Sequence, residues 1–356
     1  MTKRRLAELV QVTDRGIAGF EKGEYSPDPD TLDRIADVLD FPTDFFEAPD
    51  LEEIPASETS FRSMSRMTAA QRDAAEVGGA FALAFHDWIT TQFRLPPPNV
   101  PRLGPGVDPE TAAGIVRAEW NLGQAPIPNL IHLLEVNGVR VFSLAEDTRE
   151  VDAFSFYRGE TPFVFLNTLK TPEHSRMDAA HELGHLVLHA HHQILPQGKI
   201  AEKEAQLFGA AFLMPRDALI ASVPRIASIG TLTPHKRKWR VSLAALVYRL
   251  HEISALTDWQ YRTLNIDLSK QGLRTNEDSS IRRETSQIIA KVFAALRKRG
   301  VLKDEIAAEL HLHPKDLDAL VFRLAMIPVT GQAQTEIRSP SKPELRVYHG
   351  GGSDAA

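Results

Sequence analysis

Apolar residues recur three or four positions apart through the first 47 residues, a spacing that predicts short amphipathic helices. We expect helices over residues 3–10, 14–22 and 32–39, with Thr2, Thr13 and Thr31 as N-caps and Gly23 ending the second helix. The residues expected to close a small core are Leu6, Leu9, Val10, Ile17, Phe20, Leu32, Ile35 and Leu39. Two short helices joined by a tight turn predict a helix-turn-helix arrangement.

Residues 48–110 are expected to connect this unit to the rest of the chain. Ala48-Pro49-Asp50 and the proline-rich stretch 95–109 are typical of linkers. Between them, residues 68–93 have the pattern of one Ala-rich helix, which we expect to pack against a core.

Residues 111–230 combine helical and strand patterns. Helices are expected over residues 109–120 and 129–137. Three short runs that are apolar or alternating are typical of strands, at 139–144, 153–157 and 162–166. A further helix follows the third strand. The pattern predicts an α+β fold in which helices pack on a small sheet, flanked by all-α regions that resemble helix-turn-helix units.

The helix after the third strand contains His181-Glu182-Leu183-Gly184-His185. Residues four apart lie on one face of a helix, so both imidazoles can reach one zinc ion. Glu182 projects to the side, where a carboxylate can take a proton from zinc-activated water and pass it to a leaving amine. The alternative is an ordinary amphipathic helix with two satisfied histidines. The apolar residues on both sides of the motif favour a zinc peptidase.

A catalytic zinc usually has three protein ligands, so a third ligand is expected elsewhere in the chain. A helix predicted over residues 202–213, and ended by Pro215, has two glutamates in its first turns. Glu204 is the first candidate and Glu202 the second. The alternative is that both glutamates are solvated at the start of a helix, where they favour its positive end.

Other polar residues near the motif have weaker claims. His189 continues the face of His181 and His185, but it lies two turns from His181, about 12 Å along a straight helix, which is too far to share one ion. Arg176, near the start of the motif helix, is expected to form a structural salt bridge. The candidates for stabilising an oxyanion are Tyr157, His174 and Asn167.

The composition limits the class of protein. A chain of 356 residues that is 43% hydrophobic and 25% charged is typical of a globular protein with two or three domains. It has no cysteine, so zinc must be bound through histidine and carboxylate. No apolar stretch reaches the length of about 18 residues that a membrane helix needs, and the amino terminus lacks the apolar core of a secretory signal. We therefore expect a cytoplasmic protein with no membrane partner.

Charge is divided unevenly along the chain. Residues 1–50 contain six Lys and Arg against twelve Asp and Glu, a net of −6, which weakens the expectation of DNA binding there. Even so, Arg15 at the start of the second helix could reach a base edge or a phosphate. Residues 225–300 contain fifteen Lys and Arg against six Asp and Glu, a net of +9. The candidates for DNA contact in this region are Lys236, Arg237, Lys238 and Arg240; the alternatives are a solvated surface or a site for an acidic protein.

Several segments together resemble the ImmA/IrrE family of zinc metallopeptidases. They are Asn129-Leu130-Ile131, Asn137-Gly138-Val139, Asp152-Ala153-Phe154-Ser155, Phe165-Leu166-Asn167, the run from Arg176 to His189, Glu204-Ala205-Gln206-Leu207-Phe208 and Leu213-Met214-Pro215. The resemblance covers about residues 113–275 and implies a gluzincin-like core. It also implies His181 and His185 as zinc ligands, Glu182 as general base and Glu204, directly before Ala205, as third ligand. Members of this family cleave helix-turn-helix repressors, often in mobile elements or stress responses, and some look like antitoxins.

The stretch from Leu6 to Phe46 resembles the XRE (Cro/repressor-like) family of helix-turn-helix domains. Relatives in that family have another helix ahead of the first one predicted here. Two explanations are open: the start of the sequence is misplaced, or the domain is incomplete at its amino end.

These patterns divide the chain into five expected parts. They are an XRE-like unit (1–47), a linker with a packing helix (48–110), a metallopeptidase domain (111–230), a basic helical region with a helix-turn-helix-like layout (231–327) and a disordered tail (328–356). The function expected first is a zinc endopeptidase that cleaves a specific protein, a helix-turn-helix repressor. The alternative is a DNA-binding transcriptional regulator or antitoxin, with a cognate toxin as partner, that uses the peptidase fold as a scaffold. A third possibility is a protein-interaction module with structural zinc.

Overall fold

The computed structural model describes residues 1–54, 68–103, 106–144, 153–189, 198–224, 227–274, 277 and 281–321. The tail predicted over 328–356 lies outside the described residues, as do parts of the predicted linker. The described helices are α1 (Lys3–Val10), α2 (Asp14–Glu21), α3 (Pro29–Leu39), η1 (Thr43–Phe46), α5 (Ala69–Gln92), α6 (Pro109–Glu119), α7 (Leu130–Val136), α8 (Pro172–Leu188), α9 (Lys199–Leu213), α10 (Arg216–Ser222), α11 (Ile229–Trp239), α12 (Leu243–Glu252), α13 (Asp258–Lys270), α14 (Gln287–Lys298), α15 (Lys303–Glu309) and α16 (Pro314–Val321). Among them, no helix has both the length and the apolar character needed to cross a membrane.

The first three helices form a small unit around Ala7, Val10, Ile17 and Ile35. As predicted, the side chains of Thr2 and Thr13 accept hydrogen bonds from backbone N–H groups in the first turns of α1 and α2. Gly23 follows α2 with φ of 65°, the left-handed conformation that ends a helix.

Two details of this unit differ from the prediction. Helix α3 begins at Pro29 because the side chain of Asp28, rather than that of Thr31, caps it: the Asp28 carboxylate accepts the N–H of Thr31 at 3.0 Å. Proline at the first helical position favours this earlier start. Leu9, predicted in the core, is 40% exposed. The core positions Ala7 and Val10 are three residues apart on one face, and Leu9 points away from that face.

The sheet has three strands, β1 (Arg140–Ser143), β2 (Phe154–Arg158) and β3 (Thr161–Leu166). Their order is β1-β3-β2, with β3 parallel to β1 and antiparallel to β2. All three strands lie where the sequence predicted them, and α8 follows β3 directly. The mixed helical and strand architecture confirms the predicted α+β class.

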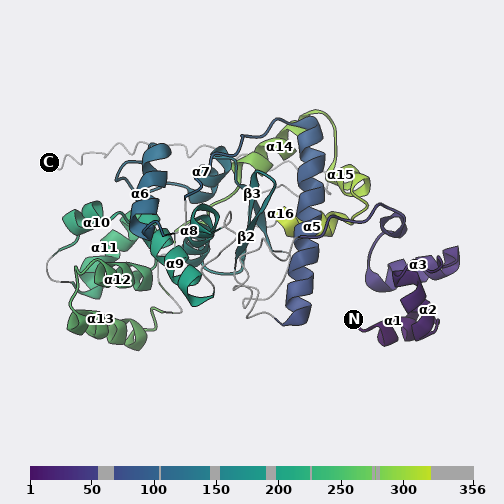
Figure 1. Ribbon diagram of the computed structural model, residues 1–356, viewed down its shortest axis with the longest axis horizontal. Helices are drawn as coiled ribbons and strands as arrows, with labels where there is room; N and C mark the ends of the chain where they lie inside the picture. The colour runs from purple at the N-terminus through teal and green to yellow at the C-terminus, as the bar shows by residue number, and fades with distance from the viewer. Residues whose placement is uncertain are drawn as a thin grey trace, which may run out of the picture. The chain divides into compact units, whose positions relative to one another are not determined.

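Side chains alternate between the two faces of the sheet. One face carries phenylalanines from all three strands, and α5 packs on it: the rings of Phe85 and Phe142 are 6.3 Å apart, and those of His86 and Phe163 are 5.2 Å apart. The other face carries smaller apolar side chains, such as Val164, and packs against α8. Figure 1 shows α5 and α8 on opposite sides of the strands. The prediction that residues 68–93 form a packing helix is therefore confirmed.

The hydrophobic core continues across residue 230, where the sequence suggested a domain boundary. Leu232 and Trp239 of α11 and Leu264 of α13 belong to the same cluster of buried residues as Leu183 of α8. Further along the chain, α14 packs on α7, and α16 packs on β1 and α5. Within the described residues, helices of the basic region therefore contribute to the core around the sheet.

Candidate metal centre

Helices α8 and α9 approach each other closely because two glycines leave room at their crossing. A Cβ atom on Gly184 would lie 3.1 Å from Cα of Ala205, and a Cβ atom on Gly209 would lie 3.0 Å from the backbone nitrogen of His181. The pairing of these positions shows that the two helices run in opposite directions. The start of α9 is therefore beside the second half of α8, where the motif residues lie.

This crossing brings His181, His185 and Glu202 together. The Nε2 atoms of the two imidazoles are 3.0 Å apart, and the Glu202 carboxylate oxygens lie 3.7 Å from Nε2 of His181 and 3.5 Å from Nε2 of His185. One ligand atom from each residue lies within 4.8 Å of the others. Tetrahedral zinc with bonds of about 2.1 Å holds its ligand atoms about 3.4 Å apart. Both the spacing and the nitrogen and oxygen donors fit a zinc ion.

Of the two glutamates, the structure places Glu202, the second choice from sequence, beside the imidazoles. Glu204 instead directs Oε2 to Nε2 of His189 at 2.9 Å. Two residues apart on a helix, the side chains leave in directions about 200° apart, so Glu202 and Glu204 cannot both face the same point.

His189 also contacts His185, because their Nδ1 atoms are 3.0 Å apart. The side chain is buried, at the carboxyl end of α8. Burial lowers the pKa of His189 below its usual value, although the hydrogen bond to Glu204 acts in the opposite direction.

Glu182 is only 2% exposed and is held by the sheet. The Ser155 hydroxyl on β2 donates a hydrogen bond of 2.7 Å to Oε2 of Glu182. Sequence reasoning did not give Ser155 a role of its own. The available signal was a small hydroxyl side chain between Phe154 and Phe156 in a predicted strand. A hydrogen bond to one carboxylate oxygen restricts how the Glu182 side chain can turn.

Two of the predicted oxyanion stabilisers make contacts of other kinds. The His174 side chain is largely exposed in the first turn of α8, with Nε2 3.6 Å from Oδ1 of Asp178. Asn167 is buried, and its Oδ1 accepts the backbone N–H of Leu169 at 2.9 Å, which stabilises the turn between β3 and α8.

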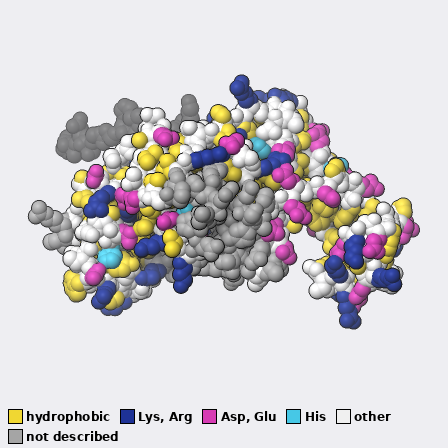
Figure 2. All heavy atoms as spheres, viewed as in Figure 1, with side chains coloured by type: hydrophobic (Ala, Val, Ile, Leu, Met, Phe, Trp, Pro, Cys, Tyr) yellow, Lys and Arg dark blue, Asp and Glu magenta, His cyan; other side chains and the backbone are white. Residues whose placement is uncertain are grey.

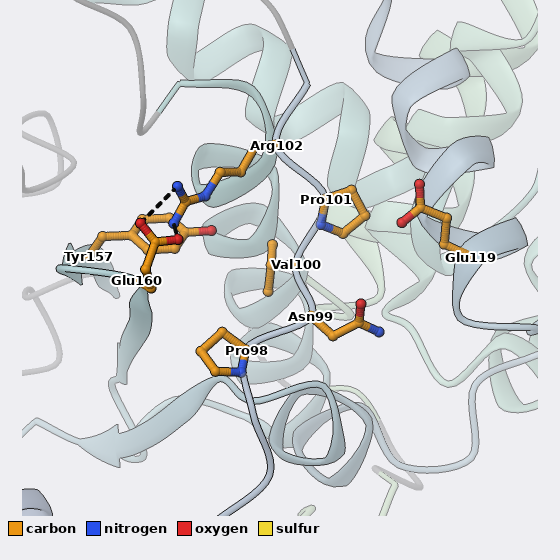
Figure 3. Close-up of a pocket in the computed structure, with 8 residues that line it drawn as sticks. All are labelled: Pro98, Asn99, Val100, Pro101, Arg102, Glu119, Tyr157 and Glu160. Atoms are coloured by element: carbon orange, nitrogen blue, oxygen red, sulfur yellow. Dashed lines mark hydrogen bonds and ion pairs between the residues drawn. The ribbon is translucent and has the colours of Figure 1, made fainter.

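Tyr157, the third predicted stabiliser, lines a pocket of about 200 Å³ together with Arg102 and Glu160. Figure 3 shows Arg102 beside the Tyr157 ring, with dashed lines joining it to Glu160. The Tyr157 hydroxyl lies 3.5 Å from the carbonyl oxygen of Leu186. Burial raises the pKa of Tyr157 to about 12, so the phenol keeps its proton.

The candidates for DNA contact fall into two groups. Arg15, Arg237 and Lys238 are exposed. Lys236 is 2% exposed and forms ion pairs with Glu277 and Glu173. The prediction that Lys236 contacts nucleic acid is therefore wrong, because its ammonium group does not reach the surface. The side chain of Arg240 is partly buried, with Nε 3.8 Å from Glu284. The sequence predicts exposed side chains for Lys236 and Arg240 because their acidic partners are distant along the chain.

No single basic face is visible on the side of the molecule drawn in Figure 2. Lys and Arg side chains there are scattered among acidic and apolar ones over α11–α13. The net charge of residues 225–300 therefore does not translate into a continuous phosphate-binding stripe on this side, and two of its cations, Lys236 and Arg240, lie beside buried carboxylates.

Comparisons with protein families agree with this architecture. Residues 134–251 match the Peptidase M78 family model, described as an IrrE N-terminal-like domain. Residues 1–46 match the helix-turn-helix family model. A search of curated proteins finds no match to the chain. The peptidase match spans the sheet, α8 and α9, and thus the whole histidine and glutamate cluster. The chain is therefore similar to the M78 peptidase family over its IrrE N-terminal-like region and to helix-turn-helix domains of the XRE type at its amino end, as the sequence predicted.

Proposed function

We propose that this chain is a zinc-dependent endopeptidase that cleaves a specific protein partner, a helix-turn-helix repressor. His181, His185 and Glu202 are the proposed zinc ligands, and Glu182 is the proposed general base. The observation that carries the proposal is the approach of two imidazole nitrogens and one carboxylate within 4.8 Å of one another, inside a domain that matches a peptidase family.

The chemistry follows from the positions of these side chains. When bound, zinc acts as a Lewis acid that polarises a peptide carbonyl and acidifies water. Glu182 follows His181 on α8, so its carboxylate projects beside the ligand face and can take a proton from water and deliver it to the leaving amine. Ser155 restrains Glu182 from the sheet, while Glu202 supplies a negative ligand from α9.

The proposed substrate class rests on two observations. The chain resembles the ImmA/IrrE family, whose members cleave helix-turn-helix repressors. It also carries a helix-turn-helix domain of its own. Such a domain can recruit a partner as well as bind DNA, and the excess of acidic residues over residues 1–50 favours a protein partner for this one.

Replacement of Glu202 by Gln should lower zinc affinity by about 100-fold or more, because it removes the charged ligand. Zinc dissociation constants are measured by competition with a chromogenic chelator. Asp217→Asn is a matched control, because it changes charge equally at an exposed position of α10. The proposal would be contradicted if the wild-type protein bound no zinc after metal supplementation. It would also be contradicted if Glu202→Gln bound zinc with the affinity of wild type.

Replacement of Ser155 by Ala should reduce kcat by about 10-fold with little change in bound zinc, because Glu182 loses the hydroxyl that orients it. Cleavage rates and zinc content are compared with those of Ser222→Ala, which removes a hydroxyl on α10 that donates to the carbonyl oxygen of Leu219 in the same helix. Equal kcat values for Ser155→Ala and wild type would show that this hydrogen bond does not position the base.

A second candidate function is a DNA-binding transcriptional regulator or antitoxin, in which the peptidase fold acts mainly as a scaffold. The helix-turn-helix match and the exposed Arg15 on α2 favour it. Binding to its own upstream DNA that weakens with salt and survives Glu182→Gln would support this function. Absence of any shift of that DNA at low salt would exclude it.

A further inference from the structure

His189 and Glu204 have no role in the proposed mechanism. Their side chains form a line of hydrogen-bonded groups that begins at His185, a proposed zinc ligand. Nδ1 of His185 is 3.0 Å from Nδ1 of His189, and Nε2 of His189 is 2.9 Å from Oε2 of Glu204. The side chains of His185 and His189 are 9% and 8% exposed, and that of Glu204 is 32% exposed. The line therefore runs from the buried ligand to a carboxylate at the edge of the cluster.

The ring atoms permit one consistent assignment of protons. Nε2 of His185 faces His181 and Glu202, so a metal there requires the lone pair on Nε2 and leaves the proton of His185 on Nδ1. That proton is donated to Nδ1 of His189, which must then carry its own proton on Nε2. The Nε2–H of His189 in turn donates to the Glu204 carboxylate, and every polar atom in the line has a partner.

The backbone fixes this line in place. The N–H of His189 donates to the carbonyl oxygen of His185 at 2.9 Å, so the last turn of α8 holds the two rings one above the other. Their ring centroids are 5.1 Å apart. Glu204 reaches His189 from α9, the helix that also supplies Glu202.

We propose that His189 and Glu204 are positioning residues, a hydrogen-bonded relay that fixes the tautomer and ring orientation of His185 for the metal. This inference rests on the proposed function, because it takes His185 to be a zinc ligand. A metal-bound histidine commonly donates its other ring N–H to a partner of this kind, and loss of such a partner lowers metal affinity about 10- to 100-fold. The competing assignment makes Glu204 itself a ligand.

The test uses the full-length chain and zinc alone as the probe. Zinc dissociation constants are measured by chelator competition for wild type, His189→Phe, Glu204→Gln and the double variant, with Asp217→Asn as the charge control. His189→Gln is added because its amide can both accept a hydrogen bond and donate one. The visible spectrum of the cobalt-substituted proteins reports ligand geometry independently of any cleavage activity.

We expect His189→Phe to weaken zinc binding by about 10- to 100-fold and to alter the cobalt spectrum. Glu204→Gln should weaken it less than Glu202→Gln does. The double variant should bind zinc no more weakly than His189→Phe does, because the two residues act in series. His189→Gln should bind zinc more tightly than His189→Phe does, because its amide restores part of the hydrogen bonding.

Three results would overturn the relay. The first is wild-type affinity in both single variants. The second is a larger loss in Glu204→Gln than in Glu202→Gln, which would make Glu204 a ligand. The third is no zinc binding by wild type, which would remove the proposed function as well and is thereby distinguishable from the other two. If circular dichroism shows that His189→Phe does not fold, Glu204→Gln decides by the same criteria.

Discussion

The Glu182→Gln variant is expected to bind zinc as wild type does but to cleave its partner about 10²- to 10⁴-fold more slowly, the usual contribution of a general acid–base group. The substitution removes the proton acceptor and keeps the size of the side chain. Its amide oxygen can still accept the hydrogen bond from Ser155, so the packing between α8 and the sheet should be unchanged. Cleavage is followed by the appearance of a new amino terminus in the partner.

The control for this experiment is the metal itself. Zinc content and thermal stability of Glu182→Gln are measured beside its activity, so that a loss of rate can be separated from a loss of metal or fold. Cleavage at the wild-type rate by the zinc-loaded variant would show that Glu182 is not the base.

Replacement of Arg176 by Met should destabilise the protein by about 3–5 kcal/mol, the usual cost of breaking a buried ion pair by removing one of its members. Arg176 is 2% exposed on α8; it pairs with Glu284 and also donates to the carbonyl oxygen of Ile127 at 2.6 Å. Burial lowers the pKa of Arg176, and the carboxylate of Glu284 opposes that shift. Glu284 further accepts the N–H of Leu130, at the start of α7, at 2.8 Å.

Differential scanning calorimetry measures this effect. A loss of 3–5 kcal/mol corresponds to a Tm lower by about 4–7 °C for a chain of 356 residues. Arg102→Met is the matched control, because its pair with Glu160 is exposed and should contribute less than about 1 kcal/mol. A Tm for Arg176→Met close to that of the control would show that the buried pair does not hold α8 in place.

The sequence predicted those features that depend on neighbouring residues. Helix caps such as Thr13, the alternation of the strands and the one-turn spacing of His181 and His185 are all properties of short segments, and the structure contains them. The family resemblance is likewise carried by short motifs, and the family models match the same regions.

The features that the sequence misassigned depend on partners far along the chain. The sequence predicts an exposed Lys236, yet the side chain is buried and forms ion pairs with Glu277 and Glu173. The sequence ranks Glu204 ahead of Glu202, but the rotation of α9 against α8 decides which of them faces the imidazoles, and it is Glu202. That rotation follows from the close contacts at Gly184 and Gly209, which no local pattern reveals.

The central claim is tested most directly by a crystal structure of the zinc-loaded protein, with anomalous scattering measured on both sides of the zinc absorption edge. We expect one strong peak within about 2.0–2.2 Å of Nε2 of His181, Nε2 of His185 and a carboxylate oxygen of Glu202, with a fourth position open to water. A peak bonded to other residues, or no peak between α8 and α9, would contradict the account.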